Sequence, residues 1–343
     1  MTKGQTARLA LGGLLGIVLL VVFLRGVEWR ALAAAFRSAG KLELLLVLVC
    51  TLLTYVVRAW RWGYLLAPLA RVPFGRLLSA TVVGFMSGLF VPRAGEILRP
   101  YLVARREGIK TSAAFASIIL ERLFDLITVV VLFGLYLYVL PTPQEQTRGP
   151  LLGVLRASGA AVGLLALAVT VVLAMFHAHA ERAMRLIDRC LSLLPARLGR
   201  PISDAARAFS AGLAVLQAPM SHLFVIAGQS VLTWLSIALG IYFNNIAFGL
   251  DLPFHTAFLI IGFLTVGVAV PTPGMVGGFH ESYRLAMTQV FAAPPEPAVA
   301  AGIALHAISN LPVLLLGLAC LPGEGLTLGK VAEIAGEGED RRP

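Results

Sequence analysis

Charged side chains are scarce in this sequence. Only 13% of its 343 residues are Asp, Glu, Lys or Arg, whereas 58% are hydrophobic. Soluble domains carry about 25% charged residues, because their surface must face water. The shortage excludes a soluble globule of this size and indicates an integral membrane protein. The formal net charge of +10 comes from cations between hydrophobic runs, so it reports membrane topology, and we expect no nucleic-acid partner.

Cysteines and familiar catalytic motifs are also lacking. Cys50, Cys190 and Cys320 lie far apart in the chain, which argues against a disulfide framework or a cysteine metal cluster. The sequence has no His-Glu-x-x-His, no Gly-x-Ser-x-Gly and no aspartate-rich metal motif, and each of these marks a common hydrolytic or metal site. We therefore expect no metal, no cofactor and no catalytic residue of these types.

Hydrophobic runs dominate what is present. A helix needs about 20 residues to cross the ~30 Å hydrocarbon core of a bilayer. Six runs approach or exceed this length, and they cover residues 9–24, 42–66, 113–140, 151–176, 222–243 and 298–321. The sequence predicts an all-α polytopic membrane protein with six spanning helices.

Two further hydrophobic runs are too short to cross a bilayer. Residues 77–91 and 257–270 would each extend only ~22 Å as helices, and both stop at proline and glycine. Each run predicts a re-entrant helical hairpin, one over residues 77–100 and one over residues 257–291. The residues expected to break the helix or to allow close backbone approach are Pro92, Gly95, Pro271, Pro273, Gly274, Gly277 and Gly278.

Four polar residues follow each short run at matching intervals. They are Glu96, Arg99, Glu121 and Asp125 in the first half, and Glu281, Arg284, His306 and Asn310 in the second. In both halves the third member follows the first by 25 positions and the fourth follows it by 29. The halves therefore look like copies, and interrupted helices at matching places are typical of the substrate site of a transporter.

This repeat divides the chain into four parts. They are a first membrane repeat over residues 1–176, a cytoplasmic amphipathic linker over 177–221, a second membrane repeat over 222–322 and a flexible tail over 323–343. The linker is rich in arginine, and its apolar residues recur at helical intervals, which favours helices on the membrane surface. A solvated connection between the repeats is an equal alternative.

The positions of Lys and Arg predict how the chain crosses the membrane. With both termini in the cytoplasm, most basic residues fall on the cytoplasmic side, as the positive-inside rule requires. The first hairpin then opens to the cytoplasm and the second to the exterior, so the two halves form inverted repeats. We expect a multi-pass protein of a bacterial inner membrane whose first run is kept as an anchor and not cleaved as a signal peptide.

One predicted span carries three charged residues, Glu121, Arg122 and Asp125. Each costs about 2.5–3.5 kcal/mol to insert, so such residues mark function by default. Glu121 and Asp125 share a helix face, where two acids repel unless a cation or a proton lies between them. They are candidates to hold an arginine, a substrate amine or a proton. The structural alternative is an ion pair that fixes helix packing.

A second polar group follows the break in the second hairpin. His280, Glu281 and Arg284 lie just after Gly277 and Gly278. Backbone amides freed at a helix start favour an anion such as phosphate, and Arg284 can add a forked contact to it. The alternative is a glycine-rich packing contact in which Glu281 and Arg284 pair with each other.

Four other arginines are candidates for gathering lipid head groups. Arg58 and Arg61 alternate with aromatic residues near the end of the run 42–66, a pattern more typical of an interfacial anchor than of head-group capture. Arg105 and Arg106 follow the first hairpin and would attract anionic lipid at the mouth of a path.

These motifs resemble those of a known family. They are Arg-Ala-Trp-Arg-Trp at 58–62, Gly-Glu-Ile-Leu-Arg-Pro at 95–100, Glu-Arg-Leu-Phe-Asp at 121–125, and Pro-Thr-Pro-Gly through Gly-Gly to Glu at 271–281. Over residues 5–322 the chain is similar to the lysylphosphatidylglycerol synthase transmembrane family, the flippase-like membrane domain of MprF-type proteins and their stand-alone relatives. The resemblance implies movement of a phospholipid between leaflets.

Two departures from the family pattern limit what the resemblance implies. The soluble aminoacyl-transferase domain of the full-length members is missing from this sequence, so we do not expect this chain to make the aminoacylated lipid. His306 stands where many relatives would have arginine, which leaves the choice of head group open.

The leading hypothesis is a flippase or transporter for a phospholipid or another polar-headed lipid. Its charged central cavity would be lined by Glu96, Arg99, Glu121, Arg122, Asp125, His280, Glu281, Arg284, His306 and Asn310. We expect membrane lipids as partners and a lipid-synthesising enzyme as a second candidate partner. Two alternatives stay open: a membrane-embedded transferase that uses carboxylates and His280 for acid-base chemistry, and a scaffold for an enzyme encoded elsewhere.

Overall fold

The computed structural model describes residues 3–25, 28–92, 94–140, 214–215, 218–327 and 329–331, together with isolated positions between 153 and 171. Within these residues every regular element is a helix, and none is a strand, which confirms the all-α fold class. Most of the expected span 151–176, almost all of the linker 177–221 and residues 332–343 of the tail lie outside the described residues.

The described helices fall into two groups of similar order. The first group is α1 (Lys3–Leu24), α2 (Trp29–Ser38), α3 (Lys41–Leu66), α4 (Phe74–Phe90), α5 (Ala94–Glu107) and α6 (Thr111–Tyr138). The second is α10 (Met220–Ala247), α11 (Thr256–Ala269), the 3-10 turn η2 (Pro273–Met275), α12 (Gly278–Leu285), the π turn η3 (Ala286–Val290), α13 (Pro295–Cys320) and the 3-10 turn η4 (Pro322–Glu324). From α3 and from α10 onward, both groups run long helix, short helix, short helix, long helix.

Among the described residues, three helices are long and apolar enough to cross a membrane: α3, α10 and α13. They match the runs predicted at 42–66, 222–243 and 298–321. Helix α6 has the length, at 28 residues, but it carries the three charges of Glu121, Arg122 and Asp125. The other three of the six expected spans remain predictions.

Both short runs form pairs of helices joined by a break. The first pair is α4 and α5, separated at Pro92, and the second is α11 and α12, separated at Pro271 and Pro273. Proline ends a helix because it has no N–H to donate and because it disfavours the α conformation of the residue before it. Each pair packs side by side as a helical hairpin, and the re-entry of the hairpins into the membrane stays a prediction.

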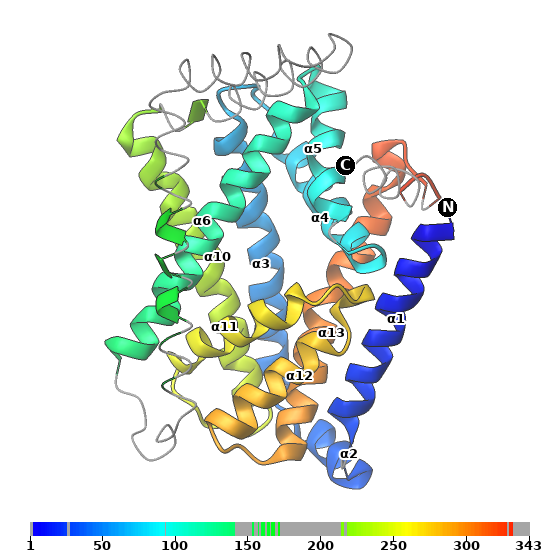
Figure 1. The fold of residues 1–343 in the computed structure, drawn as a ribbon, viewed down its shortest axis with the longest axis vertical. Coiled ribbons are helices and arrows are strands. Elements are labelled where there is room, and N and C mark those ends of the chain that lie inside the picture. The colour runs from blue at the N-terminus through cyan, green and yellow to red at the C-terminus, as the bar shows by residue number, and fades with distance from the viewer. Residues whose placement is uncertain are drawn as a thin grey trace.

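The two halves pack on each other reciprocally. Helix α3 lies along α10, α4 packs on α13, and α11 packs on α6. The α4–α5 pair lies toward one end of the molecule and the α11–α12 pair toward the other (Figure 1). Their breaks approach each other midway, where η2 contacts α4.

Glycine pairs bring the two helices of each hairpin together. A Cβ atom added to Gly95 would lie less than 3.0 Å from the carbonyl oxygen of Gly84, and one added to Gly278 would lie less than 3.0 Å from that of Gly267. Real Cβ atoms essentially never come so close, so the paired helices touch backbone to backbone. The two pairs have the same separation in sequence, 95 − 84 = 278 − 267 = 11 residues.

The glycine pairs define a register between the hairpins. Gly84 lies against the side chain of Arg99, and Gly267 lies in the same way against Ser282. This offset of 183 residues (267 − 84 = 282 − 99) is two residues shorter than the 185 that relates the polar motifs (281 − 96). By the glycine register, the counterpart of Arg99 is Ser282 and not Arg284.

The described hydrophobic residues form two cores with a charged layer between them. One core joins α4 and α5 to the neighbouring ends of α3, α6 and α10, and it includes Trp62, Leu120 and Ile226. The other joins α11, α12 and α13 to the opposite ends of α3, α6 and α10, with Val47 and Val129 among its members. Each of these three long helices therefore crosses from one core to the other.

The beginning of the C-terminal tail packs on the first hairpin. Leu321, Leu326 and Val331 belong to the core of that hairpin. Glu324 is buried, accepts a hydrogen bond from Ser79 of α4, and forms an ion pair with Arg106 of α5, with 3.3 Å between Nε and Oε2. The described start of the predicted flexible tail is therefore held in place.

The glycine contact predicts a stability difference between two alanine substitutions in the first hairpin. Gly95→Ala forces a methyl group onto the Gly84 carbonyl and should lower stability by about 1–3 kcal/mol, the usual cost of overpacking. Gly88→Ala is the matched control, because nothing lies within 4 Å of its added Cβ, and alanine in a helix gains up to about 1 kcal/mol over glycine. Thermal unfolding of the detergent-solubilised variants measures both; equal losses would contradict the backbone contact.

Candidate functional site

A cluster of buried charges occupies the layer between the two cores. Helix α3 supplies Arg58 and Arg61, and α5 supplies Arg99. Helix α6 supplies Glu121, Arg122 and Asp125. All are buried except Arg122, whose side chain is 40% exposed. Arg58 and Arg61 lie one helical turn apart, as do Glu121 and Asp125, so one face of α3 meets one face of α6.

Glu121 is held by arginines from three helices. Arg99 donates to both of its oxygens, with Nη1 to Oε1 at 3.0 Å and Nη2 to Oε2 at 3.2 Å. Arg122 Nη2 donates to Oε1 at 2.6 Å, and Arg61 Nη2 lies 3.5 Å from the same atom. A forked arginine contact of this kind fixes both position and orientation.

Asp125 is satisfied as fully as Glu121. Arg61 Nη1 donates to its Oδ1 at 2.8 Å, and Arg58 Nη1 donates to Oδ2 at 3.2 Å. The indole N–H of Trp234 on α10 also donates to Oδ1, at 3.0 Å. Ser230 of α10 accepts a second bond from Arg61 Nη1 at 2.7 Å. Both acids are thus bound on several sides by protein donors.

The cluster carries more positive than negative charge. Four guanidinium groups face two carboxylates, which gives a formal charge of 4 − 2 = +2. An uncompensated charge in the interior is costly. Several donors of the same arginines also have no hydrogen-bond partner among the described residues: Nε and Nη2 of Arg61, Nε of Arg99 and Nε of Arg122. The cluster can therefore accept a further anion.

Aromatic rings hold the arginines in place. The guanidinium carbon of Arg99 lies 4.5 Å from the ring centroid of Trp62 and 5.4 Å from that of Phe85. Arg58 lies 5.4 Å from the same Phe85 ring. Such cation–π contacts are worth about 2 kcal/mol when desolvated. Trp62 is itself fixed, because its N–H donates to Ser117 at 2.9 Å.

A cavity lies between the breaks of the two hairpins. Its volume is about 200 Å³, whereas one water molecule needs only about 10–15 Å³ by the same measure. The polar residues of its wall are Glu96, Arg99, Arg122 and Thr272, and its apolar residues include Phe85, Ile118, Val270 and Met275. Thr272 is buried, and its hydroxyl has no hydrogen-bond partner among the described residues. This inter-hairpin cavity gives access to the charged cluster at Arg99 and Arg122.

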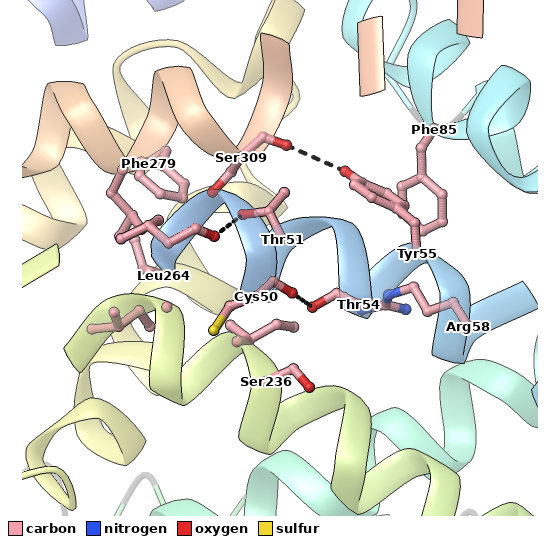
Figure 2. A pocket seen from close by; sticks show the side chains of 15 residues that line it. Cys50, Thr51, Thr54, Tyr55, Arg58, Phe85, Ser236, Leu264, Phe279 and Ser309 are labelled. Carbon is pink, nitrogen blue, oxygen red and sulfur yellow. Dashed lines mark hydrogen bonds between the residues drawn. The ribbon is translucent and has the colours of Figure 1, made fainter. Parts of the chain in front are cut away.

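A second cavity, of about 180 Å³, lies on the other side of Phe85. Arg58 and Phe85 are at one end of it, and Leu264 and Phe279 are at the other (Figure 2). Hydroxyl groups of α3, α10 and α13 line the space between, and Tyr55 donates to the backbone oxygen of Ser309 at 3.3 Å. Phe85 lines both cavities, so its ring stands between them.

The structure brings together the polar residues predicted in the first half. Glu96, Arg99 and Arg122 share the wall of the inter-hairpin cavity, with Glu121 and Asp125 directly behind Arg99 and Arg122. Arg58 and Arg61 join this cluster, although the pattern favoured an interfacial anchor for them. Their exposures of 7% and 0% place them in the interior and not at a lipid-facing girdle.

The polar residues predicted in the second half are not part of this cluster. Glu281 and Arg284 pair with each other, with Arg284 Nε donating to Oε2 at 2.8 Å, as the alternative interpretation expected. His306 Nε2 lies 2.7 Å from the Gly274 oxygen, and Asn310 donates to the backbone of its own helix. The ring of His280 packs at a tilt against that of His306, with 4.4 Å between ring centroids. These residues line neither of the two cavities and instead support the second hairpin.

The remaining predicted residues lie at the hairpin breaks and near the ends of helices. Gly274 and Gly277 have φ of 62° and 85°, which only glycine adopts easily. A Cβ on Gly277 would also collide with α1, at Leu19 and the Gly16 oxygen. Arg105 is exposed, whereas Arg106 donates to the Gly323 oxygen and pairs with Glu324. The side chain of Arg106 is thus already paired with residues at the start of the tail.

Five site residues were not predicted from the sequence. They are Thr81, Phe85, Ser230, Trp234 and Thr272. Most lie within apolar helices, where a single hydroxyl or aromatic residue carries no recognisable pattern. Trp234 alone offered a signal, because a buried indole requires an acceptor for its N–H.

Comparison with known proteins identifies related chains. A family model described as the lysylphosphatidylglycerol synthase TM region matches residues 8–317. A UPF0104 membrane protein of Methanothermobacter thermautotrophicus is 25% identical over 328 residues, which covers 90% of this chain and 92% of that protein. Glycosyltransferase AglD of Haloferax volcanii is 25% identical over 324 residues, which covers 85% of this chain but 50% of the glycosyltransferase. The chain thus matches about half the length of that protein.

Because the cluster already has excess positive charge, we expect the loss of the Glu121 carboxylate to lower the stability of the protein strongly. Glu121→Gln raises the formal charge of the cluster from +2 to +3, and removing one partner of a buried ion pair costs about 3–5 kcal/mol. Glu107→Gln is the control: its partner Arg76 is half-exposed at 2.9 Å, and such surface pairs contribute about 0–1 kcal/mol. Thermal unfolding in detergent compares the two. A small, equal loss from both would show that the cluster does not depend on Glu121.

Proposed function

This chain belongs to the lysylphosphatidylglycerol synthase transmembrane family, and we propose that it moves a polar-headed lipid between the two leaflets of a membrane. One observation carries the proposal. A buried cluster with excess positive charge lies beside a cavity between two broken helices. Charged residues inside membrane helices are kept where they face a pathway or a ligand, and irregular backbone at membrane depth is tolerated where it lines a cavity.

The packing of the helices supports inverted repeats. The two hairpins lie toward opposite ends of the molecule (Figure 1), and each packs on the last long helix that the structure describes in the other half. The glycine pairs recur with the same separation. We infer that the hairpins enter the membrane from opposite sides and that their breaks meet near its middle. Transporters with this construction bind substrate at the interface of the repeats.

The two cavities fit an alternating path for the head group. The inter-hairpin cavity offers Arg99 and Arg122, and the second cavity offers Arg58. Phe85 stands between them and contacts both Arg58 and Arg99. In the proposed cycle a head group passes from one set of arginines to the other as the repeats shift around this ring. Its acyl chains stay in the lipid throughout.

The expected setting is a bacterial inner membrane with both termini in the cytoplasm. The family and the apolar helices indicate a membrane protein. The orientation rests on the distribution of Lys and Arg along the sequence. In this orientation the first hairpin opens to the cytoplasm, so the inter-hairpin cavity is reached past Glu96 and Arg99.

A second candidate function is favoured by one relative. Glycosyltransferase AglD carries a name that denotes group transfer, and it is about twice as long as the part that this chain matches. The chain would then serve, alone or with a partner enzyme, in a transfer to a lipid-linked substrate. Incubation with candidate lipid acceptors and sugar donors would give a new lipid mass if the chain were the transferase, and no new mass if it only moves lipid.

Transport is testable in liposomes with a cavity variant. Protein-free vesicles protect their inner-leaflet fluorescent phospholipid from dithionite, and the reconstituted protein should expose it. Arg122→Gln should slow this exposure by roughly ten- to a hundredfold, because a hydrogen bond to a charged group is worth about 1.5–3 kcal/mol. Arg76→Gln, on an exposed arginine far from the cavity wall, should leave the rate unchanged. Protection equal to that of empty vesicles would refute the proposal.

A further inference from the structure

The head group that the inter-hairpin cavity accepts follows from the charges around it. Both buried acids are already saturated by protein donors. Glu121 accepts from Arg99 and Arg122 at 2.6–3.2 Å, and Asp125 accepts from Arg58, Arg61 and Trp234 at 2.8–3.2 Å. Neither carboxylate has the geometry to hold a substrate amine as well.

The buried polar atoms of the cavity wall that lack a partner can all donate a hydrogen bond. Nε of Arg99, Nε of Arg122 and the hydroxyl of Thr272 are buried without a hydrogen-bond partner among the described residues, and all three residues line the cavity. An unpaired buried donor costs about 1–3 kcal/mol. A group with several acceptor oxygens would satisfy them together. Thr272 comes from the second hairpin and the arginines from the first half, so such a group would bridge the two.

The net charge around the cavity also favours a negatively charged head group. The cluster has a formal charge of +2, and Glu96, the carboxylate on the cavity wall, interacts with Arg122 and lowers the total to +1 (2 − 1). A phosphate monoester carries about −1.5 to −2 at neutral pH and offers three acceptor oxygens. A zwitterionic or aminoacylated head group would bring a cation toward four arginines.

We propose that the cavity binds the phosphate of a lipid whose head group has net negative charge and no balancing amine. This inference rests on the proposed transport function and names its substrate class. Arg99 is held between Trp62 and Phe85 and serves as the fixed contact. Arg122, half-exposed, closes on the phosphate from α6, and Thr272 donates from the opposite hairpin. The apolar wall at Val270 and Met275 receives the first carbons of the lipid.

Binding of short-chain lipids to the full chain in detergent tests the proposal. Dihexanoyl phosphatidic acid, dihexanoyl phosphatidylethanolamine and inorganic phosphate are titrated separately, and the shift in unfolding temperature gives each affinity. We expect phosphatidic acid to bind at least tenfold more tightly than either of the others. Equal or tighter binding of phosphatidylethanolamine would overturn the preference for a head group without an amine, and equal binding of inorganic phosphate would overturn the lipid assignment.

Three variants separate binding from folding. Thr272→Val removes an unpaired hydroxyl, so it should leave the ligand-free protein as stable as before yet weaken phosphatidic acid binding several-fold. Glu96→Gln should strengthen that binding, because it removes the one negative charge on the described wall, whereas an amine-binding site would be weakened. Arg76→Gln serves as the unchanged control. Weaker phosphatidic acid binding in Glu96→Gln, or none lost in Thr272→Val, would overturn the assignment.

The two proposals fail in different ways. If phosphatidic acid binds as expected but no labelled lipid crosses the liposome membrane, the phosphate site stands and transport is refuted. If labelled phosphatidylethanolamine crosses and phosphatidic acid does not compete with it, transport stands and the phosphate site is refuted.

Discussion

The arrangement of the helices depends on the layer of excess positive charge between the two hydrophobic cores. Its arginines need acids, its acids need arginines, and the partners come from α3, α5, α6 and α10. Well-packed apolar residues often stabilise helices as well as a buried ion-pair network does. Stability alone therefore does not account for the charge. It makes sense as the polar end of a binding site that the two cores isolate from the rest of the interior.

The hairpins explain how such a layer is reached from outside. Their breaks lie beside the charged cluster, and glycine lets the two helices of each hairpin touch. The result is two cavities on either side of one aromatic ring, each with its own arginines. A fully helical bundle of the same length would have filled this space with side chains.

The helix breaks and the charged residues of the first half could be identified in the sequence because each depends on local pattern. Proline and glycine after a short run mark a break, and Glu121 with Asp125 must share a helix face. Arg58 and Arg61 were placed wrongly, since a single sequence does not show which face of a helix is turned inward. The glycine contacts give a second register, in which the counterpart of Arg99 is Ser282 and not Arg284. The sequence alone offered the Glu-x-x-Arg register, because contacts between helices are not visible in it.

The exchange of partners between the halves bears on how the chain is assembled as it is synthesised. Helix α4 rests on α13, which leaves the ribosome long after the first hairpin is complete. After its synthesis, the first half therefore lacks the α13 surface until the second half is made. During that interval the Arg99–Glu121 pair, formed wholly within the first half, can neutralise the buried arginine of the hairpin. A chain truncated before α13 would lack the surface on which α4 packs.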